Sequence, residues 1–400
     1  MKKILLGVGA SISVYKAVEI VRLLKKEGFA VKVLMTEDAT KFVSPLSFEV
    51  VSEERVIIDQ FKDADNRRVE HIRLAREYDL FLIAPATLDL IGKLSAGIAD
   101  SFLSLVFYAF EKKIIISPAM NSSMYKHPVN QRNIEFLKST GIEFLEPDSG
   151  SLACGEEGIG RLPEPEFIVE KIKYELTEKI FKGKKILITG GPTRERWDDF
   201  RFISNPSSGK TGVFLAEKAR DFGGKTILIT GKTSLKKPWG VEIVEIESAE
   251  EMLEEVKKRI AETDIFIMSA AVADFKPSEY RKGKVKKDNI SDSFKLSLSK
   301  TPDILKTVGA KKRENQIFVG FSAQESMDIQ EAKGKLKDKK LDMIVLNKIT
   351  GERGGFGSDE NKVIIISKDG EERETGFLKK DKIAEIILKE IYERWVKERK

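Results

Sequence analysis

One sequence pattern occurs at the start of the chain and again near its middle. Residues 2–9 read KKILLGVG and residues 184–191 read KKILITGG. In both copies a run typical of a buried strand leads into a glycine-bearing turn, which is how an α/β unit begins. Two such beginnings, far apart in a chain of 400 residues, predict two α/β domains and not an array of short repeats.

Strand-like apolar runs alternate with helical patterns in each half. The first half contains the expected strands KILLGV, VKVLM, LFLIAPA, KIIISPA and IEFL, with helical patterns at 12–27, 100–110 and 130–140. The second half contains KKILITGG, KTILIT, VEIVEI, DIFIMSA, QIFVGF and DMIVLN. Continuous apolar strands that alternate with helices indicate a parallel sheet with both faces covered.

The end of the second half adds one more element. KVIIISKDGEERETGF reads as a β-hairpin turned by Asp369-Gly370. We therefore expect an α/β protein of two doubly wound, mostly parallel-sheet Rossmann-like domains, the second with an added β-hairpin. The expected boundary lies within residues 178–185, which gives domains at 1–181 and 182–400.

Composition and charge exclude several classes of protein. Hydrophobic residues make up 41% of the chain and charged residues 34%, as in soluble globular proteins. The net charge is only +6 and no basic run is interleaved with aromatic residues, so we expect no nucleic-acid partner. The longest apolar run, LSLVFYAF, is too short to span a bilayer, so we expect no membrane association.

The beginning of the chain and its cysteine content bear on its compartment. The letters MKKILLGVGASIS also fit a signal peptide, with two lysines before an apolar stretch. A strand followed by a capped helix explains the same letters, and the pattern recurs inside the chain. The single cysteine, Cys154, excludes an internal disulfide and fits a reducing environment. We therefore expect a cytoplasmic protein.

Residues 202–212, FISNPSSGKTG, end in the letters that close a phosphate-binding P-loop. A P-loop has a glycine five residues before its Gly-Lys pair, where this chain has Ser204, and it leaves directly from a strand. The alternative is a helix start capped by Ser207 or Ser208, followed by an amphipathic run. The sequence favours the helix start, which leaves the nearby Asn205 and Lys210 without an explanation.

The turn after the first expected strand suits a single phosphate group. GVGASIS has Gly7 and Gly9 but Ile12 where a dinucleotide fingerprint has its third glycine. Ser11 and Ser13 at a helix N-terminus suit a phosphate monoester such as that of FMN, although they could also be plain helix caps. An NAD-dependent oxidoreductase is an alternative that Ile12 disfavours.

Three side chains in the first half are candidates for catalysis. Cys154 lies in SGSLACGEEGIGRLPEP, whose glycines favour a loop, Asn121 lies in SPAMNSSMYKHP, and His71 lies in EHIRLA. Each also has a purely structural interpretation: an inert buried thiol, a helix cap and a structural histidine.

These segments, with APATLDLIGKLSAGIAD, resemble in order the flavin-containing cysteine decarboxylases, most closely phosphopantothenoylcysteine decarboxylase, over about residues 1–170. The resemblance departs at Leu88-Asp89, where an Ala-Asn pair is more usual. It implies that FMN oxidises the substrate thiol so that carbon dioxide can leave. It implies Cys154 as a proton donor, Asn121 as a hydrogen-bond donor to the departing carboxylate, and His71 as a base near the flavin. The FMN-binding residues that it implies are Gly9, Ser11, Ser13, Thr36, Pro85, Ala86, Thr87, Ala119 and Met120.

The second half is similar, over about residues 184–350, to phosphopantothenate-cysteine ligase. The similarity rests on GGPTRERWDDFRFISNPSSGKTG, SAAVADFKPSEYRKGKVKK, KTPDIL, VGFSAQE and KLKDKKLD, with Trp197 and Pro206 as departures. It implies that CTP activates 4'-phosphopantothenate as an acyl-cytidylate, that cysteine then displaces CMP, and that Mg2+ is bound mainly through the CTP phosphates. Asn205, assigned to catalysis, then belongs to a loop that holds the phosphopantothenate end or the acyl-cytidylate. The implied nucleotide-binding residues are Ala271, Asp274, Lys284, Thr301, Pro302, Asp303, Ile304, Phe321, Lys335 and Lys339.

The whole chain thus resembles the bifunctional enzymes of coenzyme A biosynthesis. The resemblance implies 4'-phosphopantothenate, cysteine and CTP as substrates, and a homo-oligomer with flavin sites at subunit interfaces. An alternative is a flavin-binding regulatory subunit that kept the fold without the chemistry. The joint presence of His71, Asn121 and Cys154 argues against that alternative.

Overall fold

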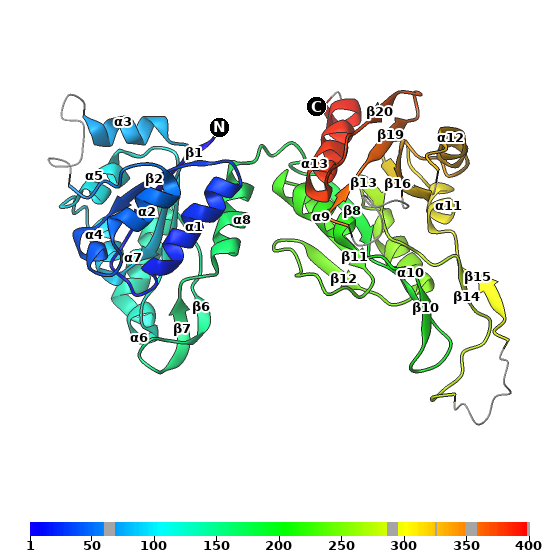
Figure 1. Cartoon of the computed structure of the whole chain (residues 1–400), viewed down its shortest axis with the longest axis horizontal. Helices are drawn as coiled ribbons and strands as arrows, with labels where there is room; N and C mark the ends of the chain where they lie inside the picture. Colours follow the sequence, from blue (N-terminus) through cyan, green and yellow to red (C-terminus); the bar gives the residue numbers. More distant parts are fainter. Residues whose placement is uncertain (60–68, 286–294, 325, 349–357, 398–400) are drawn as a thin grey trace. The chain divides into compact units, whose positions relative to one another are not determined.

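The computed structural model describes residues 1–59, 69–285, 295–324, 326–348 and 358–397 (Figure 1). The chain divides into two compact units, Met1–Leu176 and Thr177–Lys400. Among the described residues, no helix combines the length and the apolar character that crossing a membrane requires.

The first unit is built on a five-stranded parallel sheet in the order β2-β1-β3-β4-β5. Its strands are β1 (Lys3–Val8), β2 (Ala30–Met35), β3 (Leu80–Ala86), β4 (Lys113–Pro118) and β5 (Glu143–Phe144). Its α-helices are α1 (Val14–Lys26), α2 (Pro45–Ser52), α3 (Glu70–Glu77), α4 (Leu88–Ser95), α5 (Phe102–Ala109), α6 (Ser122–Lys126), α7 (Pro128–Ser139) and α8 (Pro165–Leu176), with a 3₁₀ turn at Glu37–Lys41. The order of strands, with β1 in the interior, is that of a doubly wound sheet.

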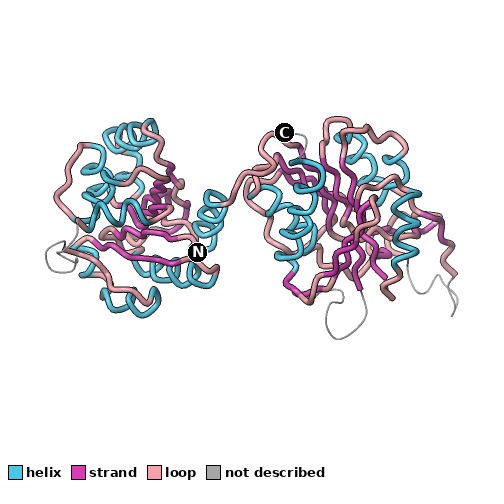
Figure 2. Tube along the Cα trace, turned by 90° about the horizontal axis from the view of Figure 1, so that it is seen from above, coloured by secondary structure: helices cyan, strands magenta, loops and turns pink. Residues whose placement is uncertain are grey.

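Both faces of this sheet are covered by helices (Figure 2). One face packs against α1, α2 and α8, and the other packs against α3, α4, α5 and α7. The pleat of β1 shows why its sequence is continuously apolar: Leu6 faces the first helical layer and Leu5 the second, and both are fully buried. Each such side chain contributes about 1.5 to 3 kcal/mol through burial.

A short antiparallel hairpin, β6 (Asp148–Ser151) and β7 (Glu157–Arg161), extends from the first unit. It contains the glycine-rich segment that the sequence places in a loop, and Cys154 lies in its turn, exposed to solvent. The hydrogen bonds from the Leu152 N–H to the Glu156 carbonyl, at 2.8 Å, and from the Gly155 N–H to the Leu152 carbonyl, at 2.9 Å, close the turn. The alternative that Cys154 is a buried thiol is therefore wrong.

The second unit is built on an eight-stranded sheet in the order β12-β11-β8-β13-β16-β17-β19-β20. Its parallel strands are β8 (Lys185–Gly190), β11 (Lys225–Thr230), β12 (Glu242–Glu245), β13 (Ile265–Met268), β16 (Ile317–Gln324) and β17 (Met343–Lys348). The antiparallel strands β19 (Val363–Ser367) and β20 (Glu372–Glu374) form the expected hairpin at one edge. The predicted fold class is confirmed in both units.

Helices again cover both faces of the second sheet. The helices are α9 (Lys210–Asp221), α10 (Ala249–Ile260), α11 (Ile304–Gly309), α12 (Ile329–Asp338) and α13 (Lys380–Ile391), which continues into a π-helical turn, Tyr392–Val396. One face packs against α9 and α13, and the other against α10, α11 and α12. Smaller antiparallel pairs are β9 (Arg194–Arg196) with β10 (Phe202–Ser204), β14 (Phe275–Pro277) with β15 (Leu298–Lys300), and β18 (Glu360–Asn361) with β21 (Leu378–Lys379).

The Ser-Gly-Lys-Thr-Gly letters form the start of α9. The prediction of a helix start is confirmed, but the predicted serine cap is wrong: the N-cap is Gly209, with φ of 80°, and it makes no side-chain capping bond. This left-handed turn favours glycine over serine. Gly212 is a packing residue, because a Cβ there would lie 2.6 Å from the Cα of Gly190 in β8.

Two candidate active sites

A cavity of about 860 Å³ lies at the carboxyl ends of the strands in the first unit. Five segments line it: the loop after β1 with the start of α1, the 3₁₀ turn after β2, the start of α4, the loop after β4 with α6, and the β6–β7 hairpin. Ligands of doubly wound sheets bind at this edge, and the volume lies within the range of small-molecule sites.

The loop after β1 presents unused polar groups to the cavity. Ser13 stands at the N-cap position of α1, yet its side chain makes no capping hydrogen bond. Ser11 lines the cavity beside it, and its Oγ accepts from the Ser13 N–H at 3.3 Å. The interpretation as a plain cap is therefore not supported for Ser13, whereas the Ser11 Oγ does accept from a backbone N–H at the helix start. The uncapped helix N-terminus suits an anion.

The predicted flavin residues fall into two groups. Those that line the cavity are Ser11, Ser13, Thr87, Ala119 and Met120. Gly9, Thr36, Pro85 and Ala86 do not line it among the described residues. Gly9 nevertheless shapes the edge, because its N–H donates to the Pro85 carbonyl at 3.0 Å and a Cβ would lie 2.7 Å from that oxygen.

Several lining residues lie beside the predicted ones and were missed. Leu88 and Asp89, which follow Thr87, also line the cavity. They were not predicted as contacts, because both residues depart from those usual in the family. Lys16 and Arg161 bring positive charge to the same cavity. Lys16 is held by the Glu164 carboxylate at 2.9 Å.

Asn121 and Cys154 meet at one wall of this cavity. The Asn121 Oδ1 accepts from the Ser123 N–H at 2.8 Å and so caps α6. This leaves the amide nitrogen to donate to the Cys154 Sγ at 3.3 Å and to the Glu156 Oε2 at 3.2 Å. The cap and the functional interpretation of Asn121 are thus compatible, because they use opposite ends of one amide.

His71 lies apart from this pair. It is a partly buried residue of α3 and does not line the cavity among the residues that the structure describes. The neighbouring Arg73 of α3 is ion-paired with Glu70 and with Glu77.

A cavity of about 430 Å³ lies at the carboxyl edge of the second unit. Six of the predicted nucleotide residues line it: Asp274, Thr301, Pro302, Asp303, Ile304 and Lys339. Lys339 pairs with Asp303 at 2.9 Å, and Asp303 caps α11 by accepting from the Lys306 N–H at 3.0 Å. Burial acts to raise the pKa of Asp303, but the Lys306 N–H and the Lys339 ammonium outweigh it and the pKa lies below its usual value.

Four other predicted nucleotide residues do not line this cavity among the described residues: Ala271, Lys284, Phe321 and Lys335. Phe321 packs on the sheet face that α9 and α13 cover, whereas Ile304 belongs to the opposite face. Lys335 pairs with Glu331 at 2.6 Å. The Lys284 Nζ lies 5.8 Å from the centre of the Phe200 ring.

A second cavity in this unit, of about 720 Å³, is lined by the loop that contains Asn205. The Asn205 amide nitrogen donates to the carbonyls of Ala271 and Val272 at 3.2 and 3.0 Å. Val272 lines the smaller cavity, so the Asn205 side chain connects the loop of the larger cavity to the wall of the smaller one. Arg194 and Lys232 give the larger cavity positive charge, and neither was predicted.

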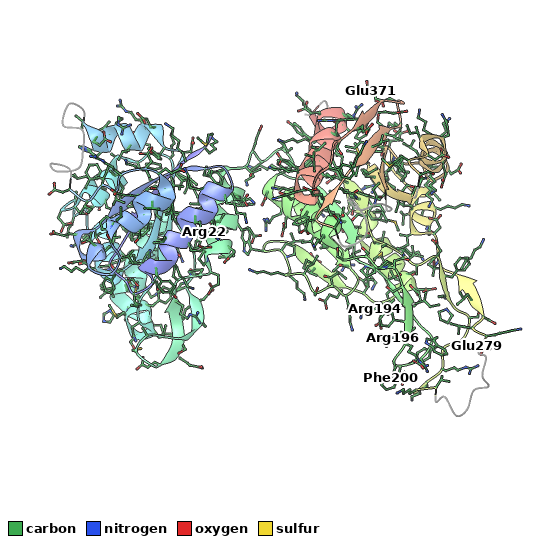
Figure 3. All side chains as sticks on the ribbon, in the orientation of Figure 1. Arg22, Arg194, Arg196, Phe200, Glu279 and Glu371 are labelled. Carbon is green, nitrogen blue, oxygen red and sulfur yellow. The ribbon has the colours of Figure 1, made fainter. Side chains whose placement is uncertain are left out.

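The β9–β10 hairpin is organised by one buried carboxylate. Asp198 is fully buried and accepts from the N–H groups of Phe200, Arg201 and Val285 at 2.8, 2.7 and 3.3 Å, as well as from the Arg201 side chain. Burial acts to raise the pKa of Asp198, but these donors hold it well below its usual range. The bond to Val285 fixes the backbone beside Lys284, near Phe200 in the region labelled in Figure 3.

No group of three or more His, Cys, Asp or Glu side chains that could hold a metal ion occurs within the described part of the chain.

Comparison with known proteins shows the family of the chain. The chain matches the family model "Flavoprotein" over residues 1–177 and the model "DNA/pantothenate metabolism flavoprotein C-terminal domain" over residues 181–394. It is 45% identical over 395 residues to the coenzyme A biosynthesis bifunctional protein CoaBC of Bacillus subtilis (strain 168), which covers 98% of this chain and 96% of that protein. The CoaBC protein of Borreliella burgdorferi is 42% identical and covers 98% of this chain and 99% of its own length.

The chain belongs to the family of bifunctional coenzyme A biosynthesis proteins. It is therefore a flavoprotein and an enzyme of coenzyme A biosynthesis, and the alternative of a regulatory subunit is not favoured. Among solved structures, the C-terminal domain of a CoaBC protein is 38% identical, covers 54% of this chain and 97% of its own, and has a TM-score of 0.46. A PPC decarboxylase mutant complexed with pantothenoylaminoethenethiol is 26% identical and has a TM-score of 0.38. The match covers 43% of this chain and 96% of that one.

Proposed function

We propose that the first unit is an FMN-dependent phosphopantothenoylcysteine decarboxylase and that the second is a CTP-dependent phosphopantothenate-cysteine ligase, both acting in the cytoplasm. The ligase joins 4'-phosphopantothenate to cysteine, and the decarboxylase converts the product to 4'-phosphopantetheine. The observation that carries the proposal is the meeting of the Asn121 amide with the Cys154 thiol, at 3.3 Å, in a cavity at the carboxyl edge of a flavoprotein sheet.

The residues of the first cavity fit FMN. Ser11, Ser13 and the uncapped N-terminus of α1 suit one phosphate monoester, and Thr87, Ala119 and Met120 would hold the rest of the cofactor. When bound, the flavin would accept the two electrons of thiol oxidation, which the loss of carbon dioxide requires, and would return them afterwards so that the product is a saturated thiol.

The chain's own residues then handle the carboxylate and the proton. The neutral Asn121 amide would donate a hydrogen bond to the substrate carboxylate, whereas an aspartate at this position would repel it. Cys154, exposed in the hairpin turn, protonates the carbon that the departing carboxylate leaves behind. His71 would act as a base near the flavin.

The position of His71 supports a homo-oligomer. It does not line the cavity among the described residues of one copy, so a role beside the flavin would fit a site that the α3 helix of another copy completes. We therefore place the flavin sites at subunit interfaces.

In the second unit the smaller cavity would bind the nucleotide. Asp274, Thr301 and Asp303 would contact it, and Lys339 would neutralise part of the triphosphate, with Mg2+ held mainly by the phosphates of CTP. The Asn205 loop, with Arg194 and Lys232, would hold the phosphopantothenate end or the acyl-cytidylate. Lys284 stays a prediction as a further contact to the triphosphate.

Purified protein is expected to be yellow and to contain FMN. The monoester-sized anion site at the start of α1 is the physical reason. Absorbance of the protein and mass analysis of the released cofactor check this directly. A colourless protein that cannot be reconstituted with FMN, or one that releases only a dinucleotide flavin, would contradict the proposal.

A further inference from the structure

The Asn121 amide nitrogen already has a carboxylate partner. It donates to the Glu156 Oε2 at 3.2 Å and to the Cys154 Sγ at 3.3 Å, while the Oδ1 of the same amide caps α6. An amide nitrogen has two hydrogens, so these two acceptors use its full donor capacity. A third acceptor can bind there only by displacing one of them.

Glu156 is held in this position by the short turn of the hairpin. The Leu152 N–H donates to the Glu156 carbonyl at 2.8 Å, and Gly155, with φ of 84°, turns the chain between Cys154 and Glu156. The Cys154 thiol also lies 3.7 Å from the Glu156 Oε2. The turn therefore presents a thiol and a carboxylate to one amide.

The Glu156 carboxylate can move away from the Asn121 amide while the backbone of the turn stays in place. Its side chain is exposed, and it makes no ion pair among the described residues. An exposed carboxylate regains its water when it swings away, so its displacement costs little compared with that of a buried ion.

We propose that Glu156 is an internal competitor for the substrate carboxylate. This inference rests on the proposed decarboxylase function. In the empty site Glu156 occupies the Asn121 amide. The carboxylate of phosphopantothenoylcysteine must displace it, and two carboxylates at one amide also repel each other. Loss of carbon dioxide removes the substrate carboxylate, so Glu156 returns to Asn121 while the product has no group to compete with it. Glu156 thereby weakens substrate binding but not product binding.

The test compares Glu156→Gln with a matched control, Glu157→Gln. Glutamine keeps the size of the side chain and removes its charge. Glu157 is the next residue, is also exposed, and its backbone belongs to the β6–β7 ladder. The KM and kcat for phosphopantothenoylcysteine and the inhibition constant of 4'-phosphopantetheine are measured on flavin-loaded protein, with flavin content and ligation as controls for folding.

Glu156→Gln is expected to lower the KM for phosphopantothenoylcysteine by about 3- to 10-fold, which corresponds to a weak exposed interaction. The inhibition constant of 4'-phosphopantetheine is expected to stay unchanged, and Glu157→Gln is expected to change neither value. An unchanged or raised KM in an active Glu156→Gln enzyme would overturn the inference, as would an equal change for product. Failure of the unaltered protein to decarboxylate would instead refute the proposed function.

Discussion

Replacement of Cys154 by serine is expected to stop the last step of decarboxylation while flavin binding and ligation stay intact. A serine hydroxyl is a far weaker acid than a thiol, and loss of a positioned proton donor typically lowers a rate by about 100- to 10,000-fold. The exposed turn position and the 3.3 Å contact with Asn121 mean that the smaller oxygen atom disturbs little else. Mass analysis should then show decarboxylated substrate as an oxidised or enethiol species.

The ligase activity and the flavin content of the same preparation serve as controls for this variant. A normal yield of the saturated thiol would clear Cys154 of the proton-donor role. Joint loss of flavin, ligation and decarboxylation would indicate damage to the protein and not to one step.

Replacement of Lys339 by glutamine is expected to raise the KM for CTP by about 10- to 100-fold. The change removes one charge-assisted hydrogen bond of about 1.5 to 3 kcal/mol, and it also leaves the Asp303 carboxylate unpaired beside the triphosphate. Initial rates of ligation over a range of CTP concentrations measure this effect. Decarboxylation of supplied phosphopantothenoylcysteine should not change, because it belongs to the other unit.

Lys335→Gln is the matched control for this prediction. Lys335 was predicted from the same KLKDK segment, but it pairs with Glu331 and does not line the cavity among the described residues. We therefore expect near-normal CTP dependence. Equal effects of the two substitutions would show that the cavity is not the nucleotide site.

The fold could be predicted because its signals are local. Strands that are buried on both faces, such as β1 and β8, are continuously apolar, and the turn at Asp369-Gly370 has a specific composition. The prediction of a serine cap for α9 was wrong because the sequence does not reveal the sign of φ. Two serines precede Gly209, but the left-handed turn lies at the glycine.

Residues that line a cavity could be predicted where one segment supplies several of them. Thr301, Pro302, Asp303 and Ile304 line the smaller cavity of the second unit because they stand together at the start of α11. Phe321 does not line this cavity among the described residues, because neighbouring positions of β16 face opposite layers and a motif does not say which layer holds the cavity. Arg194 and Lys232 were missed because only the folded chain brings their two segments together.

The claim that one chain performs both steps is tested most directly by mass analysis of its products. Purified protein is incubated with 4'-phosphopantothenate, cysteine, CTP and Mg2+. We expect 4'-phosphopantetheine, with CMP, pyrophosphate and carbon dioxide in equal amounts, and no phosphopantothenoylcysteine or phosphopantetheine when CTP is omitted. Absence of 4'-phosphopantetheine from the complete mixture, with FMN bound to the protein, would contradict the claim.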